Sequence, residues 1–149
     1  MAGRNSELYE RGMRVRREVL GDAYVDRATN PSPFTADFQR LVTEYCWGEC
    51  WADDRLTRRT RSVLNLGMTA ALGRMEEFQL HFRGALNNGL TEEELSVILL
   101  QIAVYCGIPA GVACFRSAQE VLGERAGDGA GESNGSTDAG RLRLDTDSD

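Results

Sequence analysis

The chain has 149 residues, 42% of them hydrophobic, a length and composition that suit one domain with an apolar core. All 17 basic residues are arginine, which excludes a lysine Schiff base and lysine-bound pyridoxal phosphate. A formal net charge of −6 without a basic stripe argues against nucleic acid as the main partner, and a single histidine excludes a zinc site built on several imidazoles of one chain.

The N-terminal third predicts two helices separated by a break. Apolar residues spaced among charges over 7–20 are typical of a surface helix, and Gly21 is placed to end it. Residues 30–33, Asn-Pro-Ser-Pro, interrupt the helical pattern. Over 34–45, aromatic and aliphatic residues recur at steps of three and four. This spacing predicts an amphipathic helix with an aromatic-rich inner stripe that ends near 47–48.

Two helices are predicted in the centre of the chain. Thr57 is positioned as the N-cap of the first helix, which Gly73 is placed to end. The almost continuous apolar run over 63–72 predicts that this helix is buried inside a bundle or between subunits. The next helix covers about 74–88 and stops at an Asn-Gly pair.

Two more helices complete the pattern. Thr91 and Glu94 form a capping box at the start of the first, which breaks at Gly107. Pro109 fits the first turn of the last helix, where its missing N–H costs nothing, and this helix is predicted to end at Gly123. Because no segment alternates as a strand does, the sequence predicts an all-α fold of about six helices.

The C-terminal tail, residues 123–149, differs in composition from the rest of the chain. It holds seven acidic and three basic residues among glycines and serines, with almost no apolar side chains. Such a tail cannot bury enough surface to offset the entropy of ordering, so we expect disorder there and one folded domain over 1–122. No signal segment, no apolar stretch of membrane-spanning length and no CxxC pair are present, which favours a reduced, cytoplasmic protein away from membranes.

The single histidine, His81, lies on the helix predicted over 74–88, with Glu77 one turn before it. An imidazole among aromatic side chains with a carboxylate nearby fits an acid–base group. The carboxylate would favour the protonated ring, and burial would oppose it. The alternative is an ordinary core or surface histidine with one satisfied hydrogen bond. The pair alone does not separate these interpretations.

Arginines and tryptophans are the other candidate binding residues. Arg58, Arg59 and Arg61 fit a site that holds a carboxylate through two parallel hydrogen bonds, and they equally fit a solvated or interface patch. Trp47 and Trp51 fit anchors of a core or interface as well as platforms for a substrate.

Several stretches together resemble the carboxymuconolactone decarboxylase family. The matching stretches are RGMRVRREVLGDAYVDRA (11–28), FTADFQRLVTEYCWGECW (34–51), LTRRTRSVLNLGM (56–68), EEFQLHFRGALNNGLTEEEL (76–95) and LLQIAVYCGIPAG (99–111). The wider family is marked by a Glu and a His four apart, then Asn-Asn-Gly, then Tyr-x-Gly-x-Pro. The first stretch points to the γ-carboxymuconolactone decarboxylase branch, and the resemblance spans about residues 8–122.

The resemblance implies an all-α subunit with the alkyl hydroperoxidase D-like bundle fold. Such subunits assemble into a ring-like homo-oligomer, typically a hexamer, with active sites near subunit contacts and no metal or organic cofactor. Members of the branch convert γ-carboxymuconolactone, a small lactone dicarboxylate, to β-ketoadipate enol-lactone and CO2 during protocatechuate degradation. Two alternatives stay open: another small lactone or keto acid as the substrate, and a non-catalytic or stress-related oligomer on the same scaffold.

The family motif carries the catalytic position to His81 and makes Glu77 its partner. The sister branch that resembles alkyl hydroperoxidase D has a CxxC pair one and two turns before the same histidine. Here those positions are Arg74 and Glu77, so thiol peroxidase chemistry by that route is excluded.

The resemblance also implies a set of substrate-binding residues. Arg61 matches the arginine that opens the third, buried helix, and we expect it to anchor, together with Arg58, the carboxylate that does not react. Tyr105 and Cys106 lie in the late motif, and Trp47 completes the expected set.

The family substrate explains why no cofactor is expected. Its leaving carboxylate is on the carbon next to an alkene that is conjugated with the lactone carbonyl, so the electrons of the breaking bond move through the alkene onto the carbonyl oxygen. The protein then has to stabilise that oxyanion and supply one proton to a ring carbon. We expect His81 to be the proton donor or the hydrogen-bond partner of the oxyanion, with Glu77 orienting it.

Overall fold

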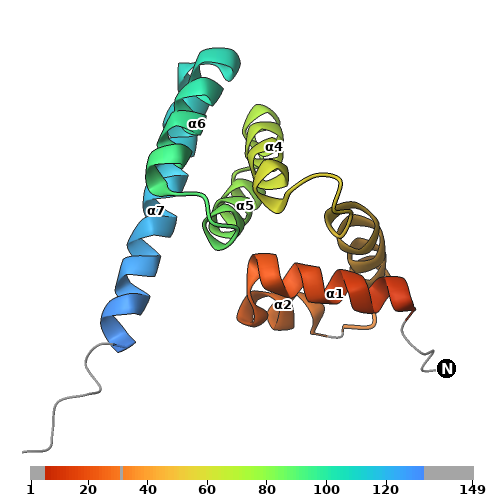
Figure 1. The fold of residues 1–149 in the computed structure, drawn as a ribbon. Helices are drawn as coiled ribbons and strands as arrows, with labels where there is room; N and C mark the ends of the chain where they lie inside the picture. Colours follow the sequence, from red (N-terminus) through yellow and green to blue (C-terminus); the bar gives the residue numbers. More distant parts are fainter. Residues whose placement is uncertain (1–5, 31, 133–149) are drawn as a thin grey trace, which may run out of the picture.

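The computed structural model describes residues 6–30 and 32–132, and Figure 1 shows this part of the chain as helices joined by short connections. It contains seven α-helices, one π-helix and no strand within those residues, which confirms the all-α prediction. None of the helices in the two described ranges is both long and apolar enough to cross a membrane. Of the tail 123–149, which was expected to be disordered, residues 123–132 belong to the last helix and 133–149 lie outside the described part.

The N-terminal half folds around a small core of its own. α1 (Glu7–Leu20) packs along the π-helix η1 (Val42–Trp51), while α2 (Asp22–Thr29) and α3 (Ala36–Leu41) connect them. The buried side chains of this core come from α1, α2 and η1, and they are Val15, Val19, Leu20, Val25, Trp47 and Trp51. Two large aromatic rings therefore fix η1 against α1.

The C-terminal half is a second group of helices, drawn in yellow-green to blue in Figure 1. α4 (Arg58–Ala71) packs on α5 (Met75–Asn87), and α6 (Glu92–Cys106) lies against α7 (Ile108–Glu132) as a helical hairpin. The fully buried members of their shared core include Leu66, Phe78, Phe82, Leu95 and Leu99. α5 also contacts α1, so it joins the two halves of the chain.

Capping chemistry sets the helix boundaries where the sequence predicted them. The Thr57 hydroxyl accepts the N3 backbone N–H at the start of α4, and Thr91 and Glu94 make both bonds of a capping box on α6. Gly73 and Gly107 follow α4 and α6 with φ of 68° and 99°. This left-handed region costs glycine little because glycine has no Cβ.

Two features of the N-terminal part differ from the prediction. α1 ends at Gly21 as predicted, but an additional helix, α2, begins at the next residue. The helix predicted to end near 47–48 continues to Trp51. It does so as a π-helix, whose bonds run from i+5 to i, as in the 3.0 Å bond from the Ala52 N–H to the Trp47 carbonyl.

The last helix is also longer than predicted. α7 passes Gly123, where the sequence placed its end, and continues to Glu132. One glycine inside a helix costs about 1 kcal/mol relative to alanine, an amount that good helix formers on either side can offset. The glycine signal was therefore too weak to locate this boundary.

Two apolar faces predicted as inner faces are exposed in the single chain. Phe34, Phe38 and Tyr45 are 95%, 62% and 69% exposed, and Leu64 and Met68 of α4 are about half exposed. Helical spacing shows which residues share a face and does not show what covers that face. Complete burial of α4 inside the chain is therefore wrong, and burial between subunits stays a prediction.

α1 and η1 approach each other through two glycines. A Cβ built on Gly12 would lie 2.1 Å from the carbonyl oxygen of Thr43, and one on Gly48 would lie 2.6 Å from the carbonyl oxygen of Leu8. Both neighbours are backbone atoms, which cannot rotate away as a side chain can. A side chain at either position must therefore push the two helices apart.

Replacing Gly12 by alanine should lower the free energy of unfolding by about 1–3 kcal/mol, the usual cost of forcing an extra carbon into a packed contact. Gly123→Ala is the matched control, because nothing lies within 4 Å of a Cβ at this helical position. We expect the control to be neutral or to gain about 0.5–1 kcal/mol. Thermal unfolding followed by circular dichroism measures both, and equal melting temperatures would contradict the close approach.

Candidate functional site

A cleft of about 1130 Å³ lies between the N-terminal half of the chain and helices α4 and α5. Most of its lining is apolar or aromatic, and these side chains include Leu20, Tyr24, Phe38, Tyr45, Trp47 and Trp51. Its polar lining includes Arg16, Gln39, Asn65, Glu77 and His81. The cleft thus combines an apolar wall with a few polar groups, as small-molecule sites do.

His81 stands at the boundary between the two halves. It comes from α5, and its ring stacks on Trp51 of η1 with centroids 6.0 Å apart and an interplanar angle of 3°. The side-chain NH2 of Asn65, on α4, lies 3.3 Å from Nδ1 and 3.2 Å from Nε2 of the ring. Three helices therefore fix the position of one half-buried imidazole that faces the cleft.

Burial lowers the pKa of His81 below its usual value of 6.5, and the nearby charge of Glu77 raises it in part. The ring is therefore neutral at pH 7. The neutral form also fits Asn65, because an amide NH2 donates to a ring nitrogen that carries a lone pair. The other ring nitrogen then carries the hydrogen and is free to donate it to a ligand.

Glu77 acts on His81 through its charge rather than through a hydrogen bond. It is exposed, it lines the cleft, and within the described residues the hydrogen-bond partner of the ring is Asn65. The sequence missed Asn65, which interrupts the apolar run of α4. That break in the run was the available signal.

Trp47 also lines the cleft, as expected for a substrate-binding residue. It is 5% exposed and stacks on Trp51 with centroids 5.0 Å apart and an interplanar angle of 28°. Both tryptophans therefore belong to the N-terminal core and present a ring to the cleft. The two interpretations left open by the sequence, a core anchor and a platform, are compatible.

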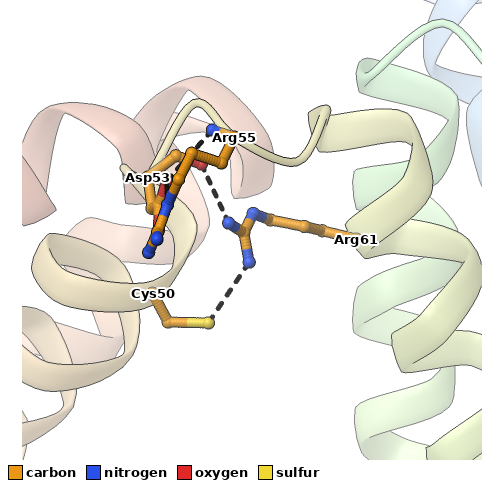
Figure 2. A network of polar contacts seen from close by, with 4 residues as sticks. All are labelled: Cys50, Asp53, Arg55 and Arg61. Carbon is orange, nitrogen blue, oxygen red and sulfur yellow. Dashed lines mark hydrogen bonds and ion pairs between the residues drawn. The ribbon is translucent and has the colours of Figure 1, made fainter.

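Arg61 lies beside the cleft and is not part of its lining. Figure 2 shows its guanidinium reaching from α4 to the chain at the end of η1. Nη2 donates to the Asp53 carbonyl at 2.8 Å, and Nη1 donates to the Cys50 sulfur at 3.4 Å. Arg55 binds the Asp53 carboxylate and holds its pKa well below the usual range. In this chain Arg61 therefore holds the segment next to Trp51.

The remaining predicted binding residues lie away from the cleft. Arg58 forms an ion pair with Glu18 of α1. Tyr105 and Cys106 are exposed at the end of α6, where they line a groove between α4 and α6. The single chain thus brings Trp47 to His81 and leaves these three outside, so their contact with a substrate stays a prediction.

Arg16 of α1 is the other polar residue that the sequence missed. It is 4% exposed, it lines the cleft, and it donates to Thr43 and Gln39. Spacing gave no signal because the first 40 residues contain six other arginines, and all of them look like surface charges. No three His, Cys, Asp or Glu side chains gather in a metal-binding arrangement in the described part of the chain.

Comparison with known proteins decides the family. Residues 36–120 match the carboxymuconolactone decarboxylase family. The chain belongs to this family. Arg16 lies before the residues that the family model matches, whereas Asn65, Glu77 and His81 lie inside them.

Relatives within the carboxymuconolactone decarboxylase family support the same conclusion. A 4-carboxymuconolactone decarboxylase of Acinetobacter baylyi is 39% identical over 119 residues, which cover 79% of this chain and 89% of that protein. A nitrosuccinic acid decarboxylase of Metarhizium robertsii is 41% identical over 118 residues, which cover 78% of this chain and 82% of that protein. A 4-carboxymuconolactone decarboxylase sequence of Pseudomonas putida is 45% identical over 44 residues, 29% of this chain and 92% of its own length. The chain is accordingly a decarboxylase of this family.

The single histidine allows the electrostatics of the site to be measured directly. In tag-free protein the imidazole proton signals in an NMR titration belong to His81 alone, and we expect a midpoint below 6.5. Glu77→Gln should move the midpoint lower still, because it removes the negative charge that favours the protonated ring. Glu76→Gln, one residue away and outside the cleft lining, is the matched control and should leave the midpoint in place. A midpoint above 6.5, or equal shifts in both variants, would be inconsistent with this site.

Proposed function

We propose that this protein is a cofactor-independent decarboxylase that converts γ-carboxymuconolactone to β-ketoadipate enol-lactone and CO2. The observation that carries the proposal is the position of His81, held between Trp51 and Asn65 at an aromatic cleft in a member of this family, and burial lowers its pKa. The name of the Acinetobacter baylyi relative supports the choice of substrate. The reaction belongs to protocatechuate degradation.

The protein does not need to supply an electron acceptor, because the substrate contains its own electron sink. The bond between the ring carbon and the carboxylate breaks, and its electron pair moves through the alkene onto the carbonyl oxygen of the lactone. One proton from water then adds to a ring carbon, which balances the loss of CO2. The barrier falls if the cleft stabilises the oxyanion of the intermediate and keeps the reacting carboxylate poorly solvated.

His81 is suited to the oxyanion. A neutral imidazole whose one nitrogen accepts from Asn65 offers the N–H of its other nitrogen to the lactone oxygen as charge develops there. Trp51 stacks on the imidazole, and both rings line the cleft. Of the two roles expected for His81, the lowered pKa favours hydrogen-bond donor over source of the proton. Glu77 tunes the pKa of the ring.

A second substrate is favoured by the relative from Metarhizium robertsii, whose name specifies nitrosuccinic acid. A nitro group beside a carboxylate accepts the electrons of the breaking bond just as the conjugated lactone does. Both acids also keep a second carboxylate after CO2 is lost. The same site therefore fits either acid, and identities of 39% and 41% give neither relative precedence.

Assembly into a homo-oligomer, expected to be a hexamer, is part of the proposal. Exposed apolar side chains on α4, α6 and α7 support it, and they include Leu64, Met68, Leu72, Val104, Ile108 and Val112. Four of them, Leu64, Met68, Ile108 and Val112, line two apolar grooves, and apolar surface of this kind marks interaction sites. Sedimentation equilibrium measures the assembly, and a monomer would contradict this part of the proposal.

Purified protein should release CO2 from the lactone at a rate that a metal chelator does not change. His81→Gln should lower kcat by about 100- to 1000-fold, the usual loss when one oxyanion donor is removed. Absorbance of the conjugated substrate follows turnover, circular dichroism checks the fold of the variant, and nitrosuccinic acid is assayed in parallel. No turnover of either acid would favour a non-catalytic oligomer, and near-normal turnover by the variant would remove His81 from the mechanism.

A further inference from the structure

Arg16 is a buried cation on the wall of the His81 cleft. It comes from the middle of α1, is 4% exposed and belongs to the cleft lining. Its Nη1 donates to the Thr43 hydroxyl at 3.0 Å, and its Nη2 donates to the Gln39 side-chain oxygen at 3.0 Å. These two bonds hold the guanidinium plane in one orientation.

The guanidinium retains donors that the protein does not use. Arginine has five N–H groups, and the bonds to Thr43 and Gln39 occupy one on each terminal nitrogen. The Nε of Arg16 is buried and has no partner within the described residues. Buried polar groups of folded proteins are nearly always satisfied, so unused donors on a cleft wall indicate a ligand that completes them.

The charge of Arg16 is also uncompensated. No aspartate or glutamate of the described residues lies within ion-pair distance of it, and no other arginine lines the cleft. Glu44, which lines the cleft too, pairs instead with Arg40 and accepts from Ser6. Burial lowers the pKa of Arg16, but an arginine stays charged in a protein. A buried charge without a counterion favours the binding of an anion.

We propose that Arg16 binds the non-reacting carboxylate of a small dicarboxylic substrate whose reacting end lies at His81. Carboxylates match the planar guanidinium fork through two parallel hydrogen bonds. The reacting carboxylate belongs away from Arg16, because pairing there would stabilise the ground state and slow the loss of CO2. This inference deepens the proposed function and rests on it for the dicarboxylic nature of the ligand. It assigns to Arg16 of α1 the carboxylate-binding role that was expected from the sequence for Arg61 and Arg58.

A purely structural role for Arg16 is the alternative to be separated. Its bonds tie α1 to α3 and η1, so replacing it alters packing as well as charge. A decisive readout must therefore compare two ligands of similar shape and different charge on the same variant. Succinate and its neutral diamide, succinamide, form such a pair, and neither has an electron sink that would allow turnover. Both tryptophans of the chain line the cleft, so intrinsic fluorescence reports binding.

The experiment measures the preference for succinate over succinamide, as a ratio of dissociation constants, in wild type, Arg16→Gln, Arg16→Lys and Arg17→Gln. Arg17 is the matched control because it pairs with Asp22 and Asp26 at the surface and lies outside the cleft lining. We expect at least a tenfold preference in wild type and in the control. The preference should fall at least tenfold in the glutamine variant, and less in the lysine variant, which keeps the charge and loses the fork.

An unchanged ratio in Arg16→Gln, or no binding of succinate to wild type at concentrations on the order of tens of millimolar, would overturn the assignment. If circular dichroism shows that the glutamine variant is unfolded, the lysine variant decides: a threefold or larger fall in the ratio supports the anchor, and a smaller one overturns it. Failure of the proposed function stays distinguishable, because it would appear as absent turnover in wild type with the succinate preference intact.

Discussion

The stacking of His81 on Trp51 is the contact on which the site depends. The imidazole comes from α5 in one half of the chain, and the indole comes from η1 in the other. Their parallel rings, with centroids 6.0 Å apart, lie where the two cores meet, beside the contact of α5 with α1. The cleft exists along this junction, so its chemistry and the packing of the two halves share the same residues.

Several features away from the junction serve the same contact. The wider turns of η1 bring Trp47 and Trp51 together as a stacked pair, and π-helical segments recur at functional sites. Arg61 holds the chain on both sides of Trp51 through Cys50 and Asp53, and Figure 2 shows these two contacts. An arginine that resembles a ligand-binding residue in sequence thus supports the wall of the site in this chain.

The two ends of the cleft differ in charge and have different roles in a decarboxylation. At one end, Arg16 offers a fixed positive charge to a carboxylate that remains in the product. At the other, His81 is neutral, because burial outweighs the charge of Glu77 in setting its pKa. A neutral donor stabilises a developing oxyanion without holding the reacting carboxylate in place as a cation would. Such a division suits any small diacid that contains its own electron sink.

Local chemistry in the sequence predicted most of the helices but only part of the site. Thr57, the Thr91 capping box and Gly107 locate boundaries because their signals act within one helical turn. The π-helix was not predicted, and its close approach to Gly12 of α1 is a tertiary contact that local spacing does not show.

The site residues divide in the same way. His81 and Glu77 share a helix, so spacing revealed them. Arg16 and Asn65 reach the cleft from other helices, and only the tertiary fold shows that one is buried and the other meets the imidazole.

The central claim is that the substrate binds in this cleft, with its reacting end at His81. A crystal structure with the saturated analogue of the lactone tests it most directly, because that analogue lacks the alkene and cannot release its electrons into the carbonyl. The account predicts that the carbonyl oxygen of the lactone lies within hydrogen-bond distance of the imidazole. It also predicts that the side-chain carboxylate binds the guanidinium of Arg16. An analogue bound elsewhere, or an imidazole sealed from the cleft in the assembled protein, would contradict it.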